Sequence, residues 1–348
     1  MIRVQLDTSP LNNLNATRGV GMYTELLKKY ISKRNDVLVL DENSQDEPDI
    51  VHYPFFDLFF RTLPIRKKTR TIVTIHDVIP LLFPEQYPPG IRGKVKLELQ
   101  KLSLHTVDAI ITDSLCSKKD IIQFLHIPEH KVHAILLAGN PSITQQPLVI
   151  IENMKKKYNL PQHYLLYIGD INYNKNLPGL IQAFSSLPNE YSLVLVGRNF
   201  NNTSIPEGEV LHKKISDLQL NDRVVCLTNV PKEPYEDMSA ILSGAIAYIQ
   251  PSLYEGFGLP ILDAMQCGTV VVSSNRSSLP EVASDAALYF DPENVQDMKT
   301  TLQRAISLSL EERSGYINKG FENVKRFSWE KTAAETIELY YKVSGLKQ

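Results

Sequence analysis

The 348-residue sequence has few cysteines and no apolar run as long as a bilayer span. Its three cysteines, Cys116, Cys226 and Cys267, are scattered and show no paired metal-ligand spacing. An odd, scattered set argues against a disulfide framework and for a reducing cytosol. Residues 1–7 are typical of a first strand rather than a signal peptide. We therefore expect a cytoplasmic protein.

The sequence also lacks an excess of charge of one sign. With 37 Lys and Arg against 39 Asp and Glu, the formal net charge is −2, so nothing indicates a nucleic-acid partner. Apolar residues make up 43% and charged residues 22%, which is typical of a soluble globular protein. The length exceeds that of one ordinary domain and predicts two.

Apolar runs alternate with amphipathic stretches along the whole chain, a pattern that predicts βαβ units and parallel sheets. Strands are expected at residues 2–7, 37–40, 49–53, 71–75, 109–112 and 132–137, then at 164–169, 192–197, 223–228, 245–250 and 269–273. The polar segment 140–151 is expected to link two doubly wound domains, 1–145 and 146–328. Ligands of such domains bind in a cleft at the carboxyl ends of the strands.

Residues 249–268, IQPSLYEGFGLPILDAMQCG, are the most informative stretch and predict a strand, a glycine loop and a helix. Gly256 and Gly258 allow a sharp turn close to a ligand. Pro260 suits the first turn of a helix, and Gly268 suits its end. Backbone N–H groups at such a helix start form an anion site, and phosphate is the usual ligand.

Two carboxylates, Glu255 and Asp263, frame this predicted anion site. Carboxylates do not bind phosphate, so their expected partners are sugar or ribose hydroxyls. Phosphate together with a polyol suggests a nucleotide sugar. For Asp263 taken alone, a second interpretation stays open, in which the side chain only complements the helix dipole.

The run EGFGLPILD, followed by CGTVVVSSNRSSLPEV and AALYFDP, resembles the donor-site signature of glycosyltransferase family 4. The resemblance implies retaining enzymes of the α/β GT-B fold, with two Rossmann-like domains facing across a cleft. It also implies that a C-terminal helix, here 329–348, returns to the first domain. The family's pattern has two glutamates; Glu255 matches the first, and Asp263 stands shortened at the second.

The resemblance assigns roles to residues in both halves. It implies that Gly19 and Gly21 line the cleft and that His76 is a functional histidine at a strand end. We expect His76 to contact donor-sugar hydroxyls and Asp77 to orient its ring. Lys175 matches the family's phosphate-binding lysine. Backbone groups near Asn229 would meet the nucleobase, and the donor loop corresponds to Gly256, Phe257, Gly258 and Leu259.

One departure concerns the cation that many members carry directly after the strand-end glycine of the second domain. Asp170 occupies that position here. Arg198 also follows a strand-end glycine, Gly197, and is the candidate replacement.

The expected reaction is transfer of a sugar from a nucleoside-diphosphate sugar to an acceptor hydroxyl, with retention of configuration. Lys175, Arg198 and the amides of residues 256–259 would stabilise the departing pyrophosphate. His76, Lys175 and Glu255 are the predicted catalytic residues. We expect no metal or cofactor. The segments GVGMYTELL and TIHDVIPLLFP resemble the mannosyl and rhamnosyl branch of polysaccharide-building members, which favours GDP-mannose and a glycan or lipid-linked acceptor.

Residues 50–105 combine clustered aromatic and basic residues. Nine Lys and Arg stand against four Asp and Glu, a local charge of 9 − 4 = +5. Such a segment could contact an anionic membrane surface. It could equally be a buried element with a solvated, charged flank, and both interpretations stay open.

Two further functions compete with sugar transfer. A non-catalytic partner of another glycosyltransferase is favoured by Asp170 and Asp263, whereas His76, Lys175 and Glu255 argue against it. A nucleotide-sugar epimerase would need further carboxylates in the cleft. A dehydrogenase is not expected, since no complete G-x-G-x-x-G follows a first strand.

Overall fold

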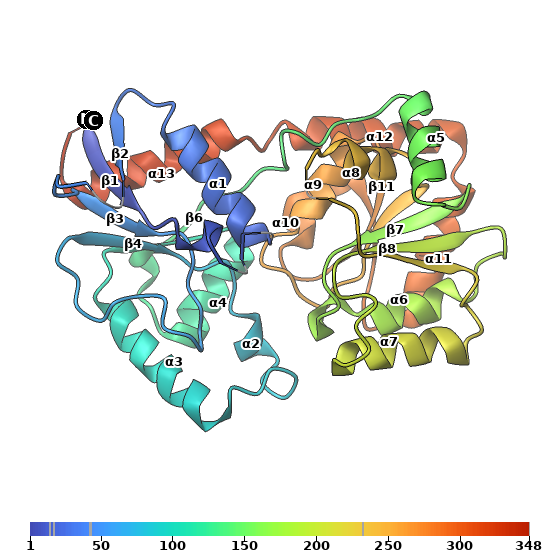
Figure 1. Cartoon of the computed structure of the whole chain (residues 1–348), viewed down its shortest axis with the longest axis horizontal. Helices are drawn as coiled ribbons and strands as arrows, with labels where there is room; N and C mark the ends of the chain where they lie inside the picture. Colours follow the sequence, from blue (N-terminus) through green and yellow to red (C-terminus); the bar gives the residue numbers. More distant parts are fainter. Residues whose placement is uncertain (14, 17, 42–43, 232, 348) are drawn as a thin grey trace. The chain divides into compact units, whose positions relative to one another are not determined.

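The computed structural model describes residues 1–13, 15–16, 18–41, 44–231 and 233–347 (Figure 1). The chain forms two compact units. Unit 1 comprises Met1–Ala138 and Phe327–Gln348, and unit 2 comprises Gly139–Arg326. The C-terminal helix therefore belongs to unit 1, as the family resemblance implies.

Unit 1 is built on a six-stranded parallel sheet with the order β2-β1-β3-β4-β5-β6. Its strands are β1 Ile2–Leu6, β2 Val37–Leu40, β3 Ile50–Tyr53, β4 Arg70–Thr74, β5 Ala109–Thr112 and β6 Val132–Ala134. Its helices are α1 Gly19–Ile31, α2 Ile79–Leu82, α3 Gly90–His105, α4 Leu115–Leu125 and α13 Trp329–Ser344, with 3-10 turns at Ser9–Leu11 and Glu129–Lys131. The strand order reverses between β1 and β3, where open α/β sheets bind ligands.

Helix α13 is fastened to unit 1 by side-chain hydrogen bonds at both of its ends. Thr332 Oγ1 donates to the Leu136 carbonyl oxygen at 2.7 Å, and Tyr341 Oη donates to that of Asp36 at 2.7 Å. The helix begins after Ser328, whose Oγ accepts from the Lys331 amide, as a serine cap requires. Helix α4 begins in the same way after Ser114, whose Oγ accepts from the Ser117 amide at 3.0 Å.

Unit 2 is built on a second six-stranded parallel sheet, ordered β12-β11-β10-β7-β8-β9. Its strands are β7 Tyr164–Ile168, β8 Ser192–Val196, β9 Val224–Leu227, β10 Ala247–Gln250, β11 Val270–Ser274 and β12 Ala287–Phe290. Its helices are α5 Leu148–Lys157, α6 Leu177–Phe184, α7 Pro206–Asp217, α8 Glu236–Ser243, α9 Leu259–Gln266, α10 Leu279–Ala283, α11 Val295–Ser307 and α12 Leu310–Val324, with 3-10 turns at Tyr173–Lys175 and Ser284–Ala286. In this doubly wound order the switch point lies between β7 and β10.

The eleven predicted strands are confirmed, most of them to within two residues at either end. The predicted strand at 132–137 ends early, at Ala134. The edge strand β12 was not predicted, because its four residues directly follow the turn Ser284–Ala286 and show no alternation. Part of the predicted linker 140–151 is helical, since α5 begins at Leu148. Within the described residues, no helix has both the length and the apolar character needed to span a bilayer.

Candidate functional site

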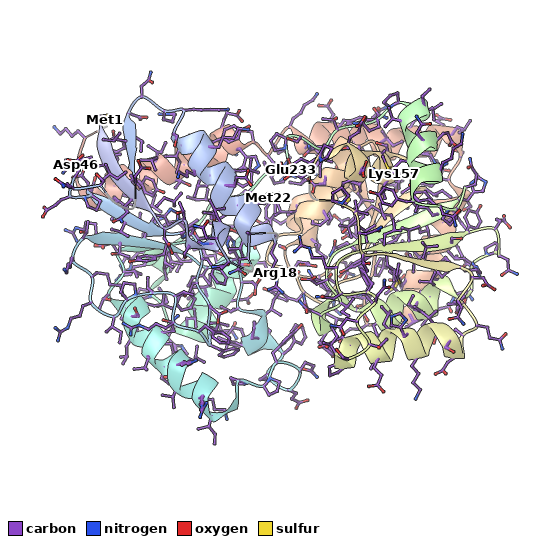
Figure 2. The ribbon with its side chains drawn as sticks, viewed as in Figure 1. Met1, Arg18, Met22, Asp46, Lys157 and Glu233 are labelled. Carbon is purple, nitrogen blue, oxygen red and sulfur yellow. The ribbon has the colours of Figure 1, made fainter. Side chains whose placement is uncertain are left out.

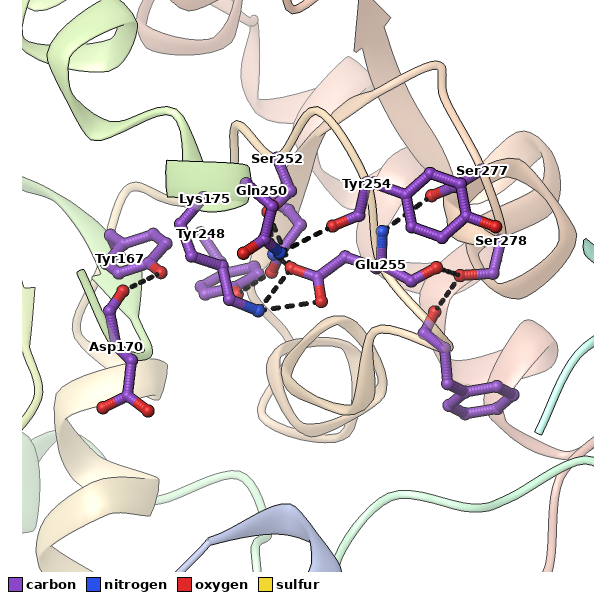
Figure 3. A network of polar contacts seen from close by, with 12 residues as sticks. Tyr167, Asp170, Lys175, Tyr248, Gln250, Ser252, Tyr254, Glu255, Ser277 and Ser278 are labelled. Carbon is purple, nitrogen blue, oxygen red and sulfur yellow. Dashed lines mark hydrogen bonds and ion pairs between the residues drawn. The ribbon is translucent and has the colours of Figure 1, made fainter. Parts of the chain in front are cut away.

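The centre of the candidate site in unit 2 is an ion pair between Lys175 and Glu255 (Figure 3). Lys175 Nζ lies 2.7 Å from Glu255 Oε1 and 2.8 Å from Oε2. Lys175 follows β7 and Glu255 follows β10, so the pair sits at the carboxyl edge of the sheet, at its switch point. The structure thus brings together two residues that are 80 positions apart in the sequence.

The Glu255 carboxylate is buried and accepts hydrogen bonds from further donors. Gln250 Nε2 and Ser252 Oγ each donate to its Oε1 at 2.6 Å, and Tyr248 Oη donates in turn to Gln250 Oε1. Burial raises the pKa of Tyr248 well above its ordinary value, so this phenol stays a donor. The counter-charge of Lys175 and these donors offset the cost of burying the carboxylate.

Two asparagines hold the backbone on either side of Lys175. Asn174 Nδ2 donates to the Tyr254 carbonyl oxygen at 2.9 Å. Asn176 has a left-handed backbone, and its Nδ2 donates to the carbonyl oxygens of Pro251 and Pro292 at 3.2 and 2.8 Å. The loops after β7 and β10 are therefore tied to each other, which fixes the lysine's position before any ligand binds.

The glycine loop leads into α9 as predicted. Gly258 has φ +106°, a conformation that L side chains rarely adopt, and helix α9 begins at the next residue with Pro260 in its first turn. Gly268 has φ +69° just beyond the helix end. Ser278 Oγ lies 2.9 Å from the carbonyl oxygens of both Glu255 and Phe257, which stabilises the turn. Within the first turn of α9, Pro260 has no N–H and the Ile261 amide donates back to the Gly258 carbonyl oxygen at 3.0 Å. An anion at this end would therefore meet the helix dipole and the amides of the preceding loop.

The four predicted donor-loop residues differ in exposure. The Phe257 side chain is buried, so only its backbone can face a ligand. Gly256 and Gly258 are also buried, whereas Leu259 is half-buried.

Asp263 lies in the second turn of α9 and turns toward the chain that enters unit 2. Its Oδ1 accepts from the Asn140 amide at 2.8 Å, and the neighbouring Gln266 Nε2 donates to the Asn140 and Ile143 carbonyl oxygens at 2.9 Å. Burial raises the pKa of Asp263 to about 7, while the Asn140 amide opposes the shift. One carboxylate oxygen of Asp263 is thus already engaged within the protein.

The ends of β7 and β8 approach each other closely through two glycines. A Cβ on Gly197 would lie 2.1 Å from the Gly169 carbonyl oxygen. Asp170, which follows Gly169, accepts from Tyr167 Oη through its backbone carbonyl at 2.8 Å, and Figure 3 shows its carboxylate pointing away from Lys175. The side chain at this position is therefore directed away from the cation.

The remaining predicted donor contacts in unit 2 are exposed. Arg198 directly follows Gly197 after β8, and Asn229 lies two residues after the end of β9. Both belong to the same carboxyl edge as Lys175 and Glu255, so the strand ends β7 to β10 all contribute to it.

In unit 1, Gly19 and Gly21 were predicted in a loop but lie in the first turn of α1, between Arg18 and Met22, which Figure 2 labels. Gly19 is the first residue of that helix, and Arg18 is its N-terminal cap. A Cβ on Gly21 would lie 2.5 Å from the Asn15 carbonyl oxygen, and the Gly21 amide donates to that oxygen at 3.1 Å. Gly21 therefore lets the loop fold tightly over the first turn of the helix.

His76 follows β4 at the carboxyl edge of the first sheet, where both of its ring nitrogens have partners. Nδ1 lies 2.7 Å from Asp113 Oδ2, and Nε2 lies 3.2 Å from the Pro54 carbonyl oxygen. Burial lowers the pKa of His76, but Asp113, with smaller effects of the Asp77 charge and the Pro54 carbonyl, outweighs burial, and the pKa is raised. Since both partners accept hydrogen bonds, the ring fits best as an imidazolium that donates from each nitrogen.

The expectation that Asp77 orients this ring is corrected by the structure. Asp77 Oδ1 accepts from the Ile79 amide at 3.0 Å at the start of α2, and Asp113 is the carboxylate bonded to the ring. The sequence held a signal for Asp113, because it directly follows β5, the neighbour of β4 in the sheet. Gln250, Ser252, Asn174 and Asn176 were also missed, since their roles depend on contacts between distant loops.

Behind His76 runs a buried chain of hydrogen bonds. Tyr340 Oη lies 2.7 Å from His52 Nδ1, His52 Nε2 lies 2.8 Å from Thr74 Oγ1, and Thr74 Oγ1 lies 3.0 Å from Tyr23 Oη. The Tyr23 ring packs edge-on against His76, with 4.9 Å between the ring centroids. Burial, with a smaller effect of the His76 charge, lowers the pKa of His52 to about 3, so His52 is neutral.

Two family models match the chain. The model for group 1 glycosyl transferases matches residues 150–323, and the model for glycosyltransferase family 4 matches residues 17–137. The chain belongs to the family 4, group 1 glycosyltransferases. This assignment confirms the family resemblance and makes the protein a hexosyltransferase.

Several curated relatives of this glycosyltransferase are mannosyltransferases. The O-antigen chain mannosyltransferase B of Escherichia coli is 34% identical over 280 residues, which cover 78% of this chain and 70% of the relative. The serotype-specific mannosyltransferase WbdA, also of Escherichia coli, is 30% identical over 279 residues, 77% of this chain but only 33% of the relative. The chain thus spans about a third of the length of WbdA.

Solved structures share the fold. HepE of Anabaena, solved with UDP and glucose, matches 98% of this chain and all of its own with a TM-score of 0.74 and 15% identity. WaaG, a glycosyltransferase involved in lipopolysaccharide biosynthesis, matches 97% of this chain and 99% of its own with a TM-score of 0.70 and 13% identity. With two parallel six-stranded sheets, the glycosyltransferase has the GT-B fold.

Proposed function

We propose that this glycosyltransferase moves mannose from GDP-mannose to a hydroxyl of a growing or lipid-linked glycan, with retention of configuration. The observation that carries the proposal is the Lys175–Glu255 pair at the switch point of the second sheet, beside the start of α9. That arrangement offers a positioned cation and helix-start amides to a diphosphate.

In the proposed reaction the bond between the anomeric carbon and the diphosphate oxygen breaks, and a bond from the acceptor oxygen to that carbon forms. The acceptor proton passes to the leaving phosphate oxygen, so the products are a glycoside and a nucleoside diphosphate. Lys175, with Arg198 after β8, would stabilise the charge that grows on the diphosphate. Because Glu255 already orients the lysine, little reorganisation would accompany donor binding.

The residues of unit 1 would act on the sugar and the acceptor. His76 as an imidazolium can donate to a donor-sugar hydroxyl if Nε2 turns partly from the Pro54 carbonyl, whose 3.2 Å contact is the longer of the two. The loop at Gly19 and Gly21 would present backbone groups to the ligand. In unit 2, Asn229 would contact the nucleobase, and the second Asp263 oxygen would contact the ribose.

The choice of mannose rests on the relatives. The O-antigen mannosyltransferase B matches this chain over 280 residues, and the segments 19–27 and 74–84 resemble the mannosyl and rhamnosyl branch. Metal independence, a cytoplasmic location and peripheral contact with the inner face of the membrane belong to the same proposal. Lys175 and the amides of the loop before α9 would supply the positive field that a metal would otherwise provide.

A second candidate function is a non-catalytic partner subunit of another glycosyltransferase. The observation that favours it is Asp170, whose carboxylate stands where many members carry an arginine and points away from Lys175. Release of GDP from GDP-mannose, dependent on a glycan acceptor and unaffected by EDTA, would support the transferase. No release with any nucleotide sugar, from a protein that binds one, would favour the partner subunit.

A further inference from the structure

Gln250, the last residue of β10, lies between a buried phenol and the carboxylate of Glu255 (Figure 3). The residue is 2% exposed. Its Oε1 accepts from Tyr248 Oη, and its Nε2 donates to Ser252 Oγ at 2.8 Å and to Glu255 Oε1 at 2.6 Å. A carboxylate that is paired with a lysine only accepts hydrogen bonds, so the amide nitrogen of Gln250 has to face Glu255 and its oxygen faces Tyr248.

The hydrogen bonds around Gln250 are all donated in the direction of Glu255. Tyr248 donates to Gln250, which donates in turn to Ser252 and to the carboxylate. Ser252 Oγ, which accepts from Gln250, donates its own proton to Glu255 Oε1 at 2.6 Å. Buried hydrogen bonds that run in one direction polarise one another, and a fully satisfied network of this kind holds a single arrangement.

The two oxygens of the Glu255 carboxylate are held differently. Oε1 accepts from Gln250, Ser252 and Lys175, whereas in the described part of the chain Oε2 accepts from Lys175 alone, at 2.8 Å. An ammonium group has three N–H donors, and the carboxylate takes two of those of Lys175. Because Gln250 and Ser252 fix Oε1, they also fix the direction of the third N–H of Lys175.

The backbone of Glu255 is held by other residues. Its amide donates to Ser277 Oγ at 2.9 Å, and its carbonyl oxygen accepts from Ser278 Oγ at 2.9 Å. Loss of the Gln250 amide would therefore leave the loop in place and release only the carboxylate side chain. The contribution of Gln250 is thus confined to the direction of this carboxylate and of the lysine bonded to it.

We propose that Gln250 is a positioning residue for sugar transfer, which holds Glu255 so that the third N–H of Lys175 points at the donor diphosphate. The inference rests on the proposed function, because it concerns the same donor site. Gln250 would not touch the ligand itself, since both N–H bonds of its amide are donated within the protein. A cation that is oriented in advance stabilises growing charge without reorganisation, and a displacement of about 1 Å can lower a rate about a hundredfold.

The first test measures kcat for the turnover of GDP-mannose by Gln250→Met, which keeps the length of the side chain and removes the amide. We expect kcat to fall about ten- to a hundredfold, because a hydrogen bond to a charged group is lost. A Gln250→Met variant that turns over GDP-mannose at the wild-type rate would overturn the proposal.

Tyr248→Phe tests whether the phenol acts through Gln250. The change removes a single oxygen atom and keeps the ring, so the variant should fold, and kcat should fall about two- to tenfold. In the Gln250→Met background the same change should have no further effect on kcat, since the acceptor of the phenol is already gone. Equal falls in both backgrounds would contradict the directed chain on which the proposal rests.

Gln250→Glu gives a readout that a loss of packing cannot imitate. The new carboxyl would stand against Glu255 Oε1, and two adjacent carboxylates share a proton with a raised pKa. While that proton is bound, the new carboxyl can donate to Glu255 and accept from Tyr248, as the amide does. The ratio of its kcat to that of wild type at the same pH should therefore fall between about pH 6 and 9. The ratio for Gln250→Met should stay constant, and a constant ratio for Gln250→Glu would overturn the proposal.

The matched control is Thr269→Val, directly before β11. Thr269 is buried, and its Oγ1 donates to the Leu242 carbonyl oxygen at 2.7 Å. The variant thus loses a buried hydrogen bond of unit 2 and none of the bonds around Glu255. It should lower the stability and leave kcat unchanged. A fall in kcat as large as that of Gln250→Met would show that lost stability alone explains the effect, and would overturn the proposal.

Chemical denaturation of Gln250→Glu at several pH values needs no sugar transfer. Its stability relative to wild type should fall as the pH rises above the ordinary pKa of a glutamate, because the folded state holds a proton that the unfolded chain releases. A constant difference would show that Gln250 does not hold Glu255 and would overturn the proposal. A wild type that transfers no sugar would refute the proposed function, and the two failures are therefore distinguishable.

Discussion

Lys175 Nζ lies within 2.8 Å of both oxygens of the Glu255 carboxylate, and this contact joins the loops after β7 and β10. The pair has a structural role and a proposed catalytic role. Removing the lysine alone would leave a buried carboxylate without its counter-charge and should destabilise the folded protein strongly. Removing both charges leaves no unpaired charge and should destabilise it much less.

Lys175→Met should therefore lower stability by about 3–5 kcal/mol, and K175M/E255Q should recover most of that loss. Neither variant should transfer sugar, because both lack the cation that we propose stabilises the diphosphate. Chemical denaturation gives the stabilities, and GDP release gives the activity. A single variant as stable as wild type would refute the structural role, and an active double variant would refute the catalytic one.

The Asp113–His76 contact predicts a pH-dependent effect on catalysis. Asp113 raises the pKa of His76, so Asp113→Asn should lower it and move the alkaline limb of kcat/KM to lower pH. A hydrogen bond to a charged group contributes roughly 1.5–3 kcal/mol. Losing this bond should therefore lower the rate about ten- to a hundredfold.

The matched control for Asp113→Asn is the neighbouring Thr112→Val. In the described part of the chain Thr112 Oγ1 is buried without a hydrogen-bond partner, so its removal should leave the pH profile in place. A profile of Asp113→Asn that matches wild type would show that Asp113 does not set the charge of His76.

Alanine should change the stability in opposite directions at two glycines of unit 2. Gly197 lies where the ends of β7 and β8 approach each other, and Gly315 lies on an open face of α12. Gly197→Ala would place a Cβ 2.1 Å from the Gly169 carbonyl oxygen, a backbone atom, so it should cost at least about 1–3 kcal/mol of stability. Gly315→Ala, inside α12 with nothing within 4 Å of the new Cβ, should stabilise by about 0.5–1 kcal/mol. Thermal unfolding of both variants measures the two effects, and a change of stability in the same direction for both would contradict the prediction.

The buried side chain of His52 predicts that the folded protein loses stability as the pH falls. Its pKa is lowered to about 3 in the folded protein. The ordinary value is about 6.5, so between the two values the unfolded chain binds more protons and stability falls as pH falls. The stability advantage of wild type over His52→Gln should therefore shrink by about 1.4 kcal/mol per pH unit between pH 6 and 4. Denaturation at several pH values measures this difference, and a constant difference for His52→Gln would contradict the prediction.

The sequence predicted the carboxyl-edge residues well because strand ends are local features. Gly258, Pro260 and Gly268 mark the turn, start and end of α9 through their own backbone preferences. The partners of these residues could not be predicted in the same way. Asn174, Asn176 and Gln250 act by reaching carbonyls or carboxylates on other loops, and Asp263 turns toward Asn140 rather than remaining open.

A thermal-shift panel of GDP, GDP-mannose, UDP and UDP-glucose without added metal tests the central claim most directly. A ligand at one hundred times its Kd adds about 2.7 kcal/mol to stability, which is readily detected. We predict that GDP and GDP-mannose stabilise the wild type, that the uridine ligands do so less, and that K175M/E255Q loses the effect. A well-folded wild type that no nucleotide stabilises would contradict the assignment of Lys175 and the α9 loop as a donor site.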